Sequence, residues 1–136
     1  MSTIFTKIIN REIPAYIVAE DEHSIAFLDI MPLVKGHLLV VPKKEVDYIF
    51  DLDDEDYSNL LLFAKKVGKA MESVISCTRI GVAVIGLEVP HVHIHLIPLR
   101  SMGDIDFSRP KLKLTEEVMK GIAAKISDAY NALPTD

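Results

Sequence analysis

Hydrophobic positions along the chain recur with two periods, which predict helices in some stretches and strands in others. Helical spacing occurs in residues 4–13, from an acidic start within 51–56 to about residue 75, and over about 115–132. Extended or alternating stretches predict five strands, at 16–20, 24–29, 37–41, 79–85 and 91–97. Because short, hairpin-length links join the strands, we expect an α+β fold: a mostly antiparallel sheet of about five strands with a long helix packed on it and a C-terminal helix.

Single residues predict where the helices begin and end and which faces they bury. Pro14 is expected to close the first helix, and Thr115 is expected to cap the last. Acidic residues within 51–56 suit the N-terminal end of a helix dipole, so this run is interpreted as a solvated helix start, with a cation site as the alternative. The core faces are expected to carry Leu60, Phe63, Ala64, Val67, Met71 and Val74 in the long helix, and Val118, Ile122, Ile126 and Ala129 in the last.

Three of the five histidines lie in one alternating stretch, His91–Pro98. Alternation with period two is typical of a strand, so we expect Val92, Ile94 and Leu96 to face a core and the three histidines to line the opposite face. At about 3.3 Å per residue the outer histidines would lie about 13 Å apart, as a line rather than a cage.

Length, charge and cysteine content narrow the classes of function. The 136 residues suit one domain, 1–136, and the net charge of −5 gives no reason to expect a nucleic-acid partner. Cys77 is the only cysteine, so no intramolecular disulfide can form. No stretch has the uninterrupted apolar length of a membrane helix, and the first residues lack the pattern of a signal peptide. We therefore expect a cytoplasmic protein that does not bind a membrane.

The residues alone leave four interpretations of the histidine stretch open. It could be a solvated face without a role, or a metal site, although no second cysteine and no carboxylate at motif spacing completes a ligand set. It could be a nucleophilic site, since a neutral imidazole can attack phosphorus and neighbouring imidazoles can stabilise the phosphoryl group or leaving group. In that case His93 is the natural nucleophile, with His95 beside the leaving group or phosphoryl oxygens and His91 ordering the strand. The fourth interpretation is the same anion-binding face without turnover.

The stretch His91-Val92-His93-Ile94-His95-Leu96-Ile97-Pro98 resembles the signature of the histidine triad (HIT) family, in which three histidines alternate with apolar residues. The segments Ile4–Pro14, Phe27–Pro32 and Gly36–Lys44 are similar to the opening and the two central strands of its nucleotide-binding, Hint-like branch. The likeness covers about residues 3–100, which leaves 101–136 as a C-terminal extension.

This resemblance implies a HIT-like fold and a homodimer whose sheets join across the subunits. It implies hydrolysis of nucleoside phosphoramidates, nucleotidyl conjugates or dinucleoside polyphosphates at the α-phosphorus, through a nucleotidyl intermediate on His93, without a cofactor. The third triad position is His95, whereas a transferase branch carries glutamine there, which favours hydrolysis over transfer.

The resemblance also implies roles in binding a purine nucleotide. Asp29 matches the residue that binds the ribose hydroxyls, and His37 matches a fourth histidine that supports the site. The phosphate loop corresponds to Gly86, Glu88 and Val89. The apolar slot around the base corresponds to five residues that could equally be plain core: Ile4, Phe5, Ile13, Phe27 and Ile30.

The sequence departs from the family pattern in two places. Thr3, Thr6 and Glu45 stand where many members carry two cysteines and a histidine for zinc, so we expect no structural metal. Before the triad, Leu87 and Glu88 replace an amide and a hydroxyl residue, and a carboxylate beside a phosphate is repulsive unless it turns away. The alternative function is therefore a nucleotide-binding or regulatory dimer with little or no turnover.

Overall fold

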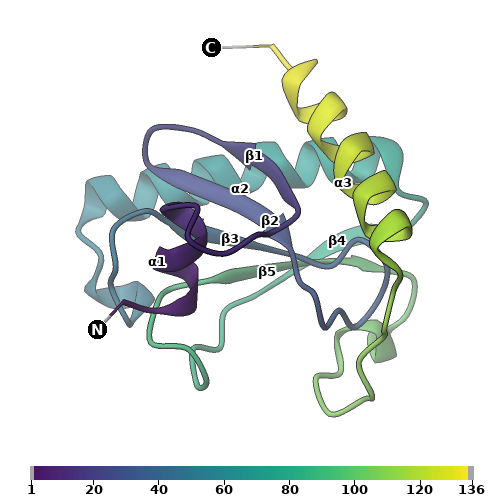
Figure 1. Cartoon of the computed structure of the whole chain (residues 1–136), viewed down its shortest axis with the longest axis horizontal. Helices are drawn as coiled ribbons and strands as arrows, with labels where there is room; N and C mark the ends of the chain where they lie inside the picture. Colours follow the sequence, from purple (N-terminus) through teal and green to yellow (C-terminus); the bar gives the residue numbers. More distant parts are fainter. Residues whose placement is uncertain (1, 135–136) are drawn as a thin grey trace.

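The computed structural model describes residues 2–134 as a five-stranded antiparallel sheet with helices on both faces (Figure 1). In chain order the elements are α1 (Ile4–Ile9), β1 (Ile17–Glu20), β2 (Ser24–Leu28), β3 (Leu38–Pro42), η1 (Ile49–Asp51), α2 (Asp54–Val74), β4 (Arg79–Ala83), β5 (Ile94–Leu99), η2 (Met102–Ile105) and α3 (Glu116–Asn131). The strands lie in the order β1-β2-β3-β5-β4, and every neighbouring pair is antiparallel. The α+β fold and the order of elements are confirmed.

Two hydrophobic clusters lie on opposite faces of the sheet, because alternate residues of each strand point to opposite sides. Leu38, Val40, Ile94 and Leu96 pack with α2 and α3 on one face. The other face packs against α1, through Phe5, Ile8, Ile25, Phe27, Leu39 and Val41. In Figure 1, α1 lies in front of the sheet and α2 behind it. β2, β3 and β5 are consequently buried on both sides.

Helix α1 ends four residues earlier than expected. Its end does not use Pro14: the N–H groups of Arg11 and Glu12 donate to the carbonyls of Ile8 and Lys7, at 3.0 and 2.8 Å. This pair of bonds closes the helix as a Schellman motif, which needs a left-handed residue, and Arg11 has φ +61°. Glycine is the usual sequence signal for such a helix end, and because Arg11 stands at this position the sequence did not indicate where α1 ends.

Three other expectations need correction. β5 begins at Ile94, so His91 and His93 precede the strand, and β4 ends at Ala83. The ten residues 84–93 that join β4 to β5 are longer than a hairpin link. In α3 the expected Ile126 is buried, Ile122 and Ala129 are partly buried, and Val118 is exposed. Met119 and Ala123 complete the buried face, which is rotated by about one residue from the expected one.

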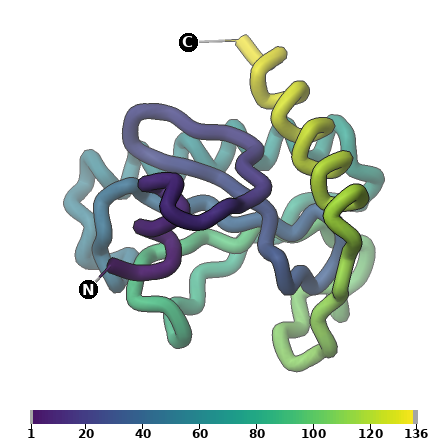
Figure 2. The backbone as a smooth tube through the Cα atoms, viewed as in Figure 1, coloured from purple at the N-terminus to yellow at the C-terminus, as the bar shows by residue number. Residues whose placement is uncertain are grey.

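The chain segments around the histidines come from distant parts of the sequence. Figure 2 shows the loop after β4, the loop between β2 and β3 and the segment after β5 projecting from the same side of the sheet. The last two are joined where Leu112 N–H donates to the Pro32 carbonyl at 2.8 Å. Within the described residues, no helix has the length and apolar character needed to cross a membrane.

Candidate functional site

His93 presents one free ring nitrogen to the site. Its Nδ1 lies 2.8 Å from the main-chain carbonyl of His91, and a carbonyl can only accept. Nδ1 therefore carries the proton, and in the neutral ring Nε2 keeps its lone pair. The edge of the Phe5 ring packs on the imidazole, with ring centres 5.0 Å apart and planes inclined by 68°. The ring is thus held with a nucleophilic nitrogen available.

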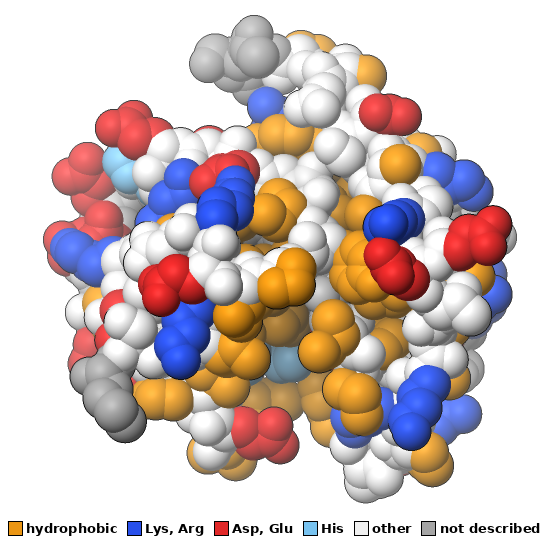
Figure 3. Space-filling model, in the orientation of Figure 1, with side chains coloured by type: hydrophobic (Ala, Val, Ile, Leu, Met, Phe, Trp, Pro, Cys, Tyr) orange, Lys and Arg blue, Asp and Glu red, His pale blue; other side chains and the backbone are white. Residues whose placement is uncertain are grey.

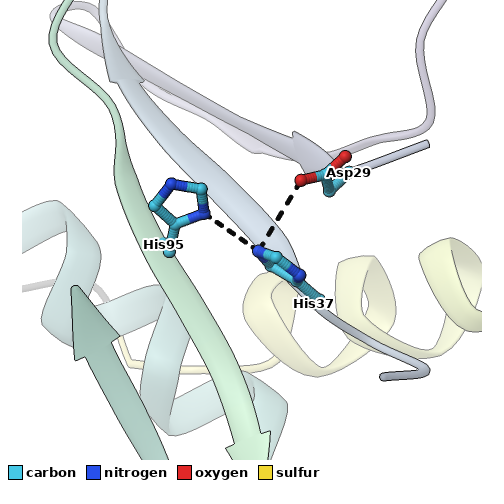
Figure 4. A group of neighbouring side chains, drawn as sticks. All are labelled: Asp29, His37 and His95. Carbon is cyan, nitrogen blue, oxygen red and sulfur yellow. Dashed lines mark hydrogen bonds and ion pairs between the residues drawn. The ribbon is translucent and has the colours of Figure 1, made fainter. Parts of the chain in front are cut away.

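His95 and His37 are hydrogen-bonded to each other (Figure 4), and a main-chain N–H group ends this chain of bonds. Leu33 N–H donates to His37 Nδ1 at 3.0 Å, so Nδ1 is an acceptor and the proton of the neutral His37 ring lies on Nε2. His37 Nε2 lies 2.9 Å from His95 Nδ1, to which it donates. His95 Nδ1 is therefore an acceptor, and His95 Nε2 carries a proton that can be donated to a bound group.

Burial keeps this pair neutral. Loss of solvation, together with the neighbouring His95, lowers the pKa of His37 to about 3. Loss of solvation and the neighbouring His93 lower the pKa of His95 to about 4. Because both rings are uncharged near neutral pH, the hydrogen-bonded chain from Leu33 to His95 has a single direction.

The loop before His37 needs a glycine. Gly36 has φ +93°, and a Cβ added there would lie 2.6 Å from Ile75 Cδ1 and 3.2 Å from Pro98 Cγ. Only glycine adopts this conformation without strain at such close approach. Gly36 therefore allows the loop to turn back so that Leu33 reaches His37.

Asp29 completes a group of three side chains that sequence spacing did not indicate. Its Oδ2 lies 3.7 Å from His37 Nε2, and its Oδ1 accepts from Met31 N–H at 2.9 Å. Burial raises the pKa of Asp29. The ligand atoms of Asp29, His37 and His95 lie within 4.8 Å of one another, so a carboxylate that no motif spacing linked to the histidines lies beside two of them.

This group has the spacing of a metal site but not the required tautomer. A histidine ligand binds through a nitrogen lone pair, and zinc prefers bond lengths of about 2.0–2.1 Å in a tetrahedron. The Leu33 N–H occupies the lone pair of His37 Nδ1, which leaves the proton on Nε2, the atom that faces Asp29 and His95. As it stands, the group favours proton donation over metal binding.

His91 lies at the back of the site, fully buried in a network with α1. Its Nε2 donates to the Pro42 carbonyl and its Nδ1 accepts from the Thr3 hydroxyl, both at 2.8 Å. The Glu45 carboxylate accepts from the Thr6 hydroxyl at 2.6 Å and from Thr3 N–H at 2.9 Å, and these bonds lower its pKa. The residues at the family's zinc positions therefore bond directly to one another, and they hold His91 so that its carbonyl meets His93. Absence of a structural metal stays a prediction.

Replacing Thr3 with valine is expected to lower the free energy of unfolding by about 2–3 kcal/mol. The change removes the donor to the buried His91 Nδ1 and also the N-cap of α1, where the Thr3 hydroxyl accepts from Thr6 N–H. Urea unfolding followed by circular dichroism measures the loss. The matched change Thr6→Val removes a hydroxyl that bonds near the surface, and a loss from Thr3→Val no larger than from Thr6→Val would contradict the role of Thr3.

The residues expected to form the apolar slot divide into a floor and a rim. Phe5 and Phe27 are buried, with ring centres 5.7 Å apart, and Ile13 packs on the same cluster. Ile4 and Ile30 are 49% and 66% exposed, and they form the rim, where a ligand can contact them. In Figure 3 a histidine side chain lies at the bottom of a hollow surrounded by hydrophobic side chains.

The loop before the triad places its charged residue at the edge of the site. Gly86 has φ +73°, and Val89 packs on the cluster of Phe5. Leu87 is 87% exposed, and its side chain contributes nothing to the buried site. Glu88 is exposed too, and its negative charge adds a small part to the rise in the pKa of Asp29 that burial causes.

Phe107 is a site residue that the sequence did not indicate. Its ring packs edge-on against His95, with centres 4.8 Å apart at 74°, and against His37 at 6.2 Å and 85°. Lys111 Nζ donates to the Phe107 carbonyl at 2.6 Å, and its positive charge opposes part of the rise in the pKa of Asp29 that burial causes. The only signal was a lone aromatic residue in a polar stretch, which is too weak to predict a contact with the triad.

Comparison with known proteins supports one family. The model of the HIT domain matches residues 10–102. An uncharacterised HIT-like protein of Methanocaldococcus jannaschii is 42% identical over 126 residues, covering 88% of this chain and 97% of that protein. An adenosine 5'-monophosphoramidase of Schizosaccharomyces pombe is 36% identical over 130 residues, covering 93% and 97%. Among solved structures, a Hit-like protein from Bartonella henselae superposes with a TM-score of 0.83 at 34% identity, covering 94% and 96%.

Proposed function

The chain belongs to the HIT family, and from this we propose that it is a nucleotide hydrolase that cleaves at the α-phosphorus of nucleoside phosphoramidates, nucleotidyl conjugates or dinucleoside polyphosphates. One observation carries the proposal: His93 offers an Nε2 lone pair while the neighbouring His95 offers an Nε2 proton, with ring centres 5.1 Å apart. A nucleophile beside a hydrogen-bond donor is the pairing that displacement at a phosphoryl group needs. A cytoplasmic setting remains part of this proposal.

In the first step His93 Nε2 attacks the α-phosphorus, and the bond from phosphorus to the leaving group breaks. The leaving group takes the bonding electron pair: an oxygen departs as the anion, and an amine departs neutral because the phosphoramidate nitrogen takes a proton from solvent before the bond breaks. The proton stays on His93 Nδ1, and its hydrogen bond to the His91 carbonyl stabilises the positive charge that forms on the ring. His95 Nε2–H donates to a phosphoryl oxygen or to the leaving group.

In the second step water attacks the nucleotidyl-histidine. The bond from phosphorus to His93 Nε2 breaks, and the imidazole takes back the electron pair and returns to its neutral form. The oxygen of water leaves on the nucleoside monophosphate with one of its protons, and the other proton passes to solvent. One water is consumed for each bond cleaved. Because His95 and His37 remain neutral, their hydrogen-bonded chain needs no resetting between turnovers.

Asp29 and the apolar slot supply the nucleotide-binding part of the proposal. The Asp29 carboxylate is partly accessible, with 22% of its side chain exposed, and can accept bonds from two ribose hydroxyls. The base would lie among Ile4, Phe5, Ile13, Phe27 and Ile30, of which the two exposed isoleucines would lose water contact on binding. An apolar slot of this kind accepts a purine base but does not discriminate between different purines.

The experiment that tests the proposal is intact-protein mass spectrometry after mixing with adenosine phosphoramidate, with AMP release followed in the same tube. An added adenylyl mass together with AMP supports the covalent hydrolase. AMP binding without adduct or AMP release would contradict turnover. That outcome would favour the nucleotide-binding dimer, for which the charge of the exposed Glu88 near Asp29 is the specific observation.

We further propose that the protein is a homodimer joined through β4. This strand lies at the edge of the sheet with one side unpaired, and its Val82 is 60% exposed. On α2, Leu62 is 65% exposed. A groove of about 520 Å³ between α2 and β4 is lined by apolar residues, including Leu61, Val82 and Leu96, and also by the charged residues Lys65, Lys69, Glu72 and Arg79. An open edge with exposed apolar residues favours pairing with a second copy.

Replacing Val82 with lysine is expected to shift the protein from dimer to monomer. A charge placed in the paired edge would have to be buried without a partner, which weakens association by about tenfold or more. Sedimentation equilibrium measures the mass directly. The control is Val118→Lys on α3, a valine that is 37% exposed and lies away from the edge. A wild-type monomer, or a Val82→Lys variant that sediments as the wild type does, would contradict this interface.

A further inference from the structure

A second cavity, of about 560 Å³, lies beside the loop that holds His37 and outside the triad. It is bounded by residues 33–36, the C-terminal end of α2 with Ser76 and Cys77, the start of η2, and α3. Its volume falls in the range of about 300–1,000 Å³ typical of small-ligand sites. None of the residues assigned to the nucleotide lines it.

The cavity combines an apolar floor with a cationic rim. The floor includes Leu33, Val74, Ile75 and Ile122. The charged residues around it are four cations and one carboxylate, in a chain whose net charge is −5: Lys35, Arg100, Arg109, Lys125 and Asp104. This local excess of positive charge opposes the overall charge of the molecule.

The carboxylate at the rim is already engaged, whereas two of the cations are available. Asp104 accepts from the N–H groups of Arg100 and Ser101, at 2.8 and 3.1 Å. Lys35 and Lys125 are exposed, and within residues 2–134 no hydrogen bond or ion pair engages either ammonium group. A ligand anion would therefore meet unpaired ammonium groups at the mouth and an apolar surface below.

We propose that this cavity is a binding site for a small apolar molecule with one terminal carboxylate, and that its occupancy lowers turnover at the triad. The apolar body would cover the floor, and the carboxylate would lie between Lys35 and Lys125.

The loop 33–36 connects the cavity with the triad. The Leu33 side chain lines the cavity, while the Leu33 N–H donates to His37 Nδ1. An occupant that displaces Leu33 lengthens this bond, and the proton of His37 is then no longer confined to Nε2. His95 Nδ1 is then no longer always the acceptor, so the proton of His95 lies on Nε2, facing the substrate, in a smaller fraction of the protein molecules. This second part rests on the proposed function.

Isothermal titration calorimetry with decanoate tests the binding. We expect one saturable site per chain, affinity about fivefold weaker in the double variant Lys35→Gln/Lys125→Gln, and unchanged affinity in the matched double variant Lys7→Gln/Lys113→Gln, which alters exposed lysines elsewhere. Decanol, without the charge, should bind more weakly than decanoate. Equal affinity in the two double variants, or displacement of decanoate by AMP, would overturn the site.

Alkylation of Cys77 provides a second measurement that does not depend on substitutions. Cys77 is half-buried in the cavity wall, so saturating decanoate should slow its reaction with iodoacetamide at least threefold. An unchanged rate would place decanoate elsewhere and overturn the proposal.

Turnover of adenosine phosphoramidate tests the coupling. Saturating decanoate should lower the rate at least twofold in the wild type, and the concentration that gives half of this effect should be about fivefold higher in the Lys35→Gln/Lys125→Gln variant. If decanoate binds but the turnover of the wild type is unchanged, the coupling is refuted, while the proposal of a binding site stands. Absence of turnover in every sample would count against the proposed function, and the calorimetry would still decide the binding site.

Discussion

Replacing His93 with alanine is expected to abolish hydrolysis of adenosine phosphoramidate, by at least about 1,000-fold, while AMP affinity changes by no more than about threefold. The loss follows because His93 Nε2 is the ring nitrogen whose lone pair no hydrogen bond within residues 2–134 occupies, with Nδ1 committed to the His91 carbonyl. Binding is retained because the proposed contacts of the ribose and base involve other residues. AMP release and intact mass are measured on the same samples, and the adenylyl adduct of the wild type should be absent from His93→Ala.

A histidine outside the site serves as the control for this variant. His23 lies in the turn between β1 and β2 and is exposed, so His23→Ala should keep both the adduct and the parent rate. Circular dichroism of both variants establishes that they fold. Hydrolysis by His93→Ala at the parent rate would show that the nucleophile is another group.

The free energy of unfolding is expected to fall steeply as pH drops from 7 to 5. His37 and His95 have pKa values of about 3 and about 4 in the folded chain because burial removes their solvation, against the ordinary 6.5 once unfolded. The unfolded chain therefore binds protons first as the pH falls below 6.5. Two such protons give a slope that approaches about 2.7 kcal/mol per pH unit near pH 5. The stability is fully present above pH 6.5 and is lost progressively towards pH 3–4.

Two other groups modify this slope. Burial also lowers the pKa of His91, which adds to the loss. Asp29 acts with the opposite sign, since its raised pKa makes the folded chain take up a proton before the unfolded one does, and it offsets part of the loss at acid pH. Urea unfolding at pH 7, 6 and 5 measures the slope. His95→Gln should reduce the slope by the contribution of about one proton. A free energy of unfolding that stays constant from pH 7 to 5 would contradict burial of these histidines in their neutral form.

The fold was largely predictable because most of its elements follow from local patterns. Helix α2 begins where Asp53 caps it by accepting from Asp56 N–H at 2.8 Å, and its expected core stripe is buried except for Val74, which is partly buried. Prediction failed where a tertiary contact replaced a local signal. At the end of α1, Arg11 takes the left-handed conformation that normally marks glycine and pairs with Glu20 at 2.6 Å, a partner nine residues away.

The sequence by itself determined the family, the order of elements and the histidines of the triad, because alternation along seven residues is a local property that places those side chains on one face of the chain. The tertiary structure decided their chemistry. Pairing of β3 with β5 brings His37 to His95, and the loop before β3 brings Leu33 N–H to His37. Which nitrogen carries a proton depends on partners from other segments, among them Thr3 for His91. No spacing within one segment encodes those partners, because sheet order and loop packing bring them together only in the folded chain.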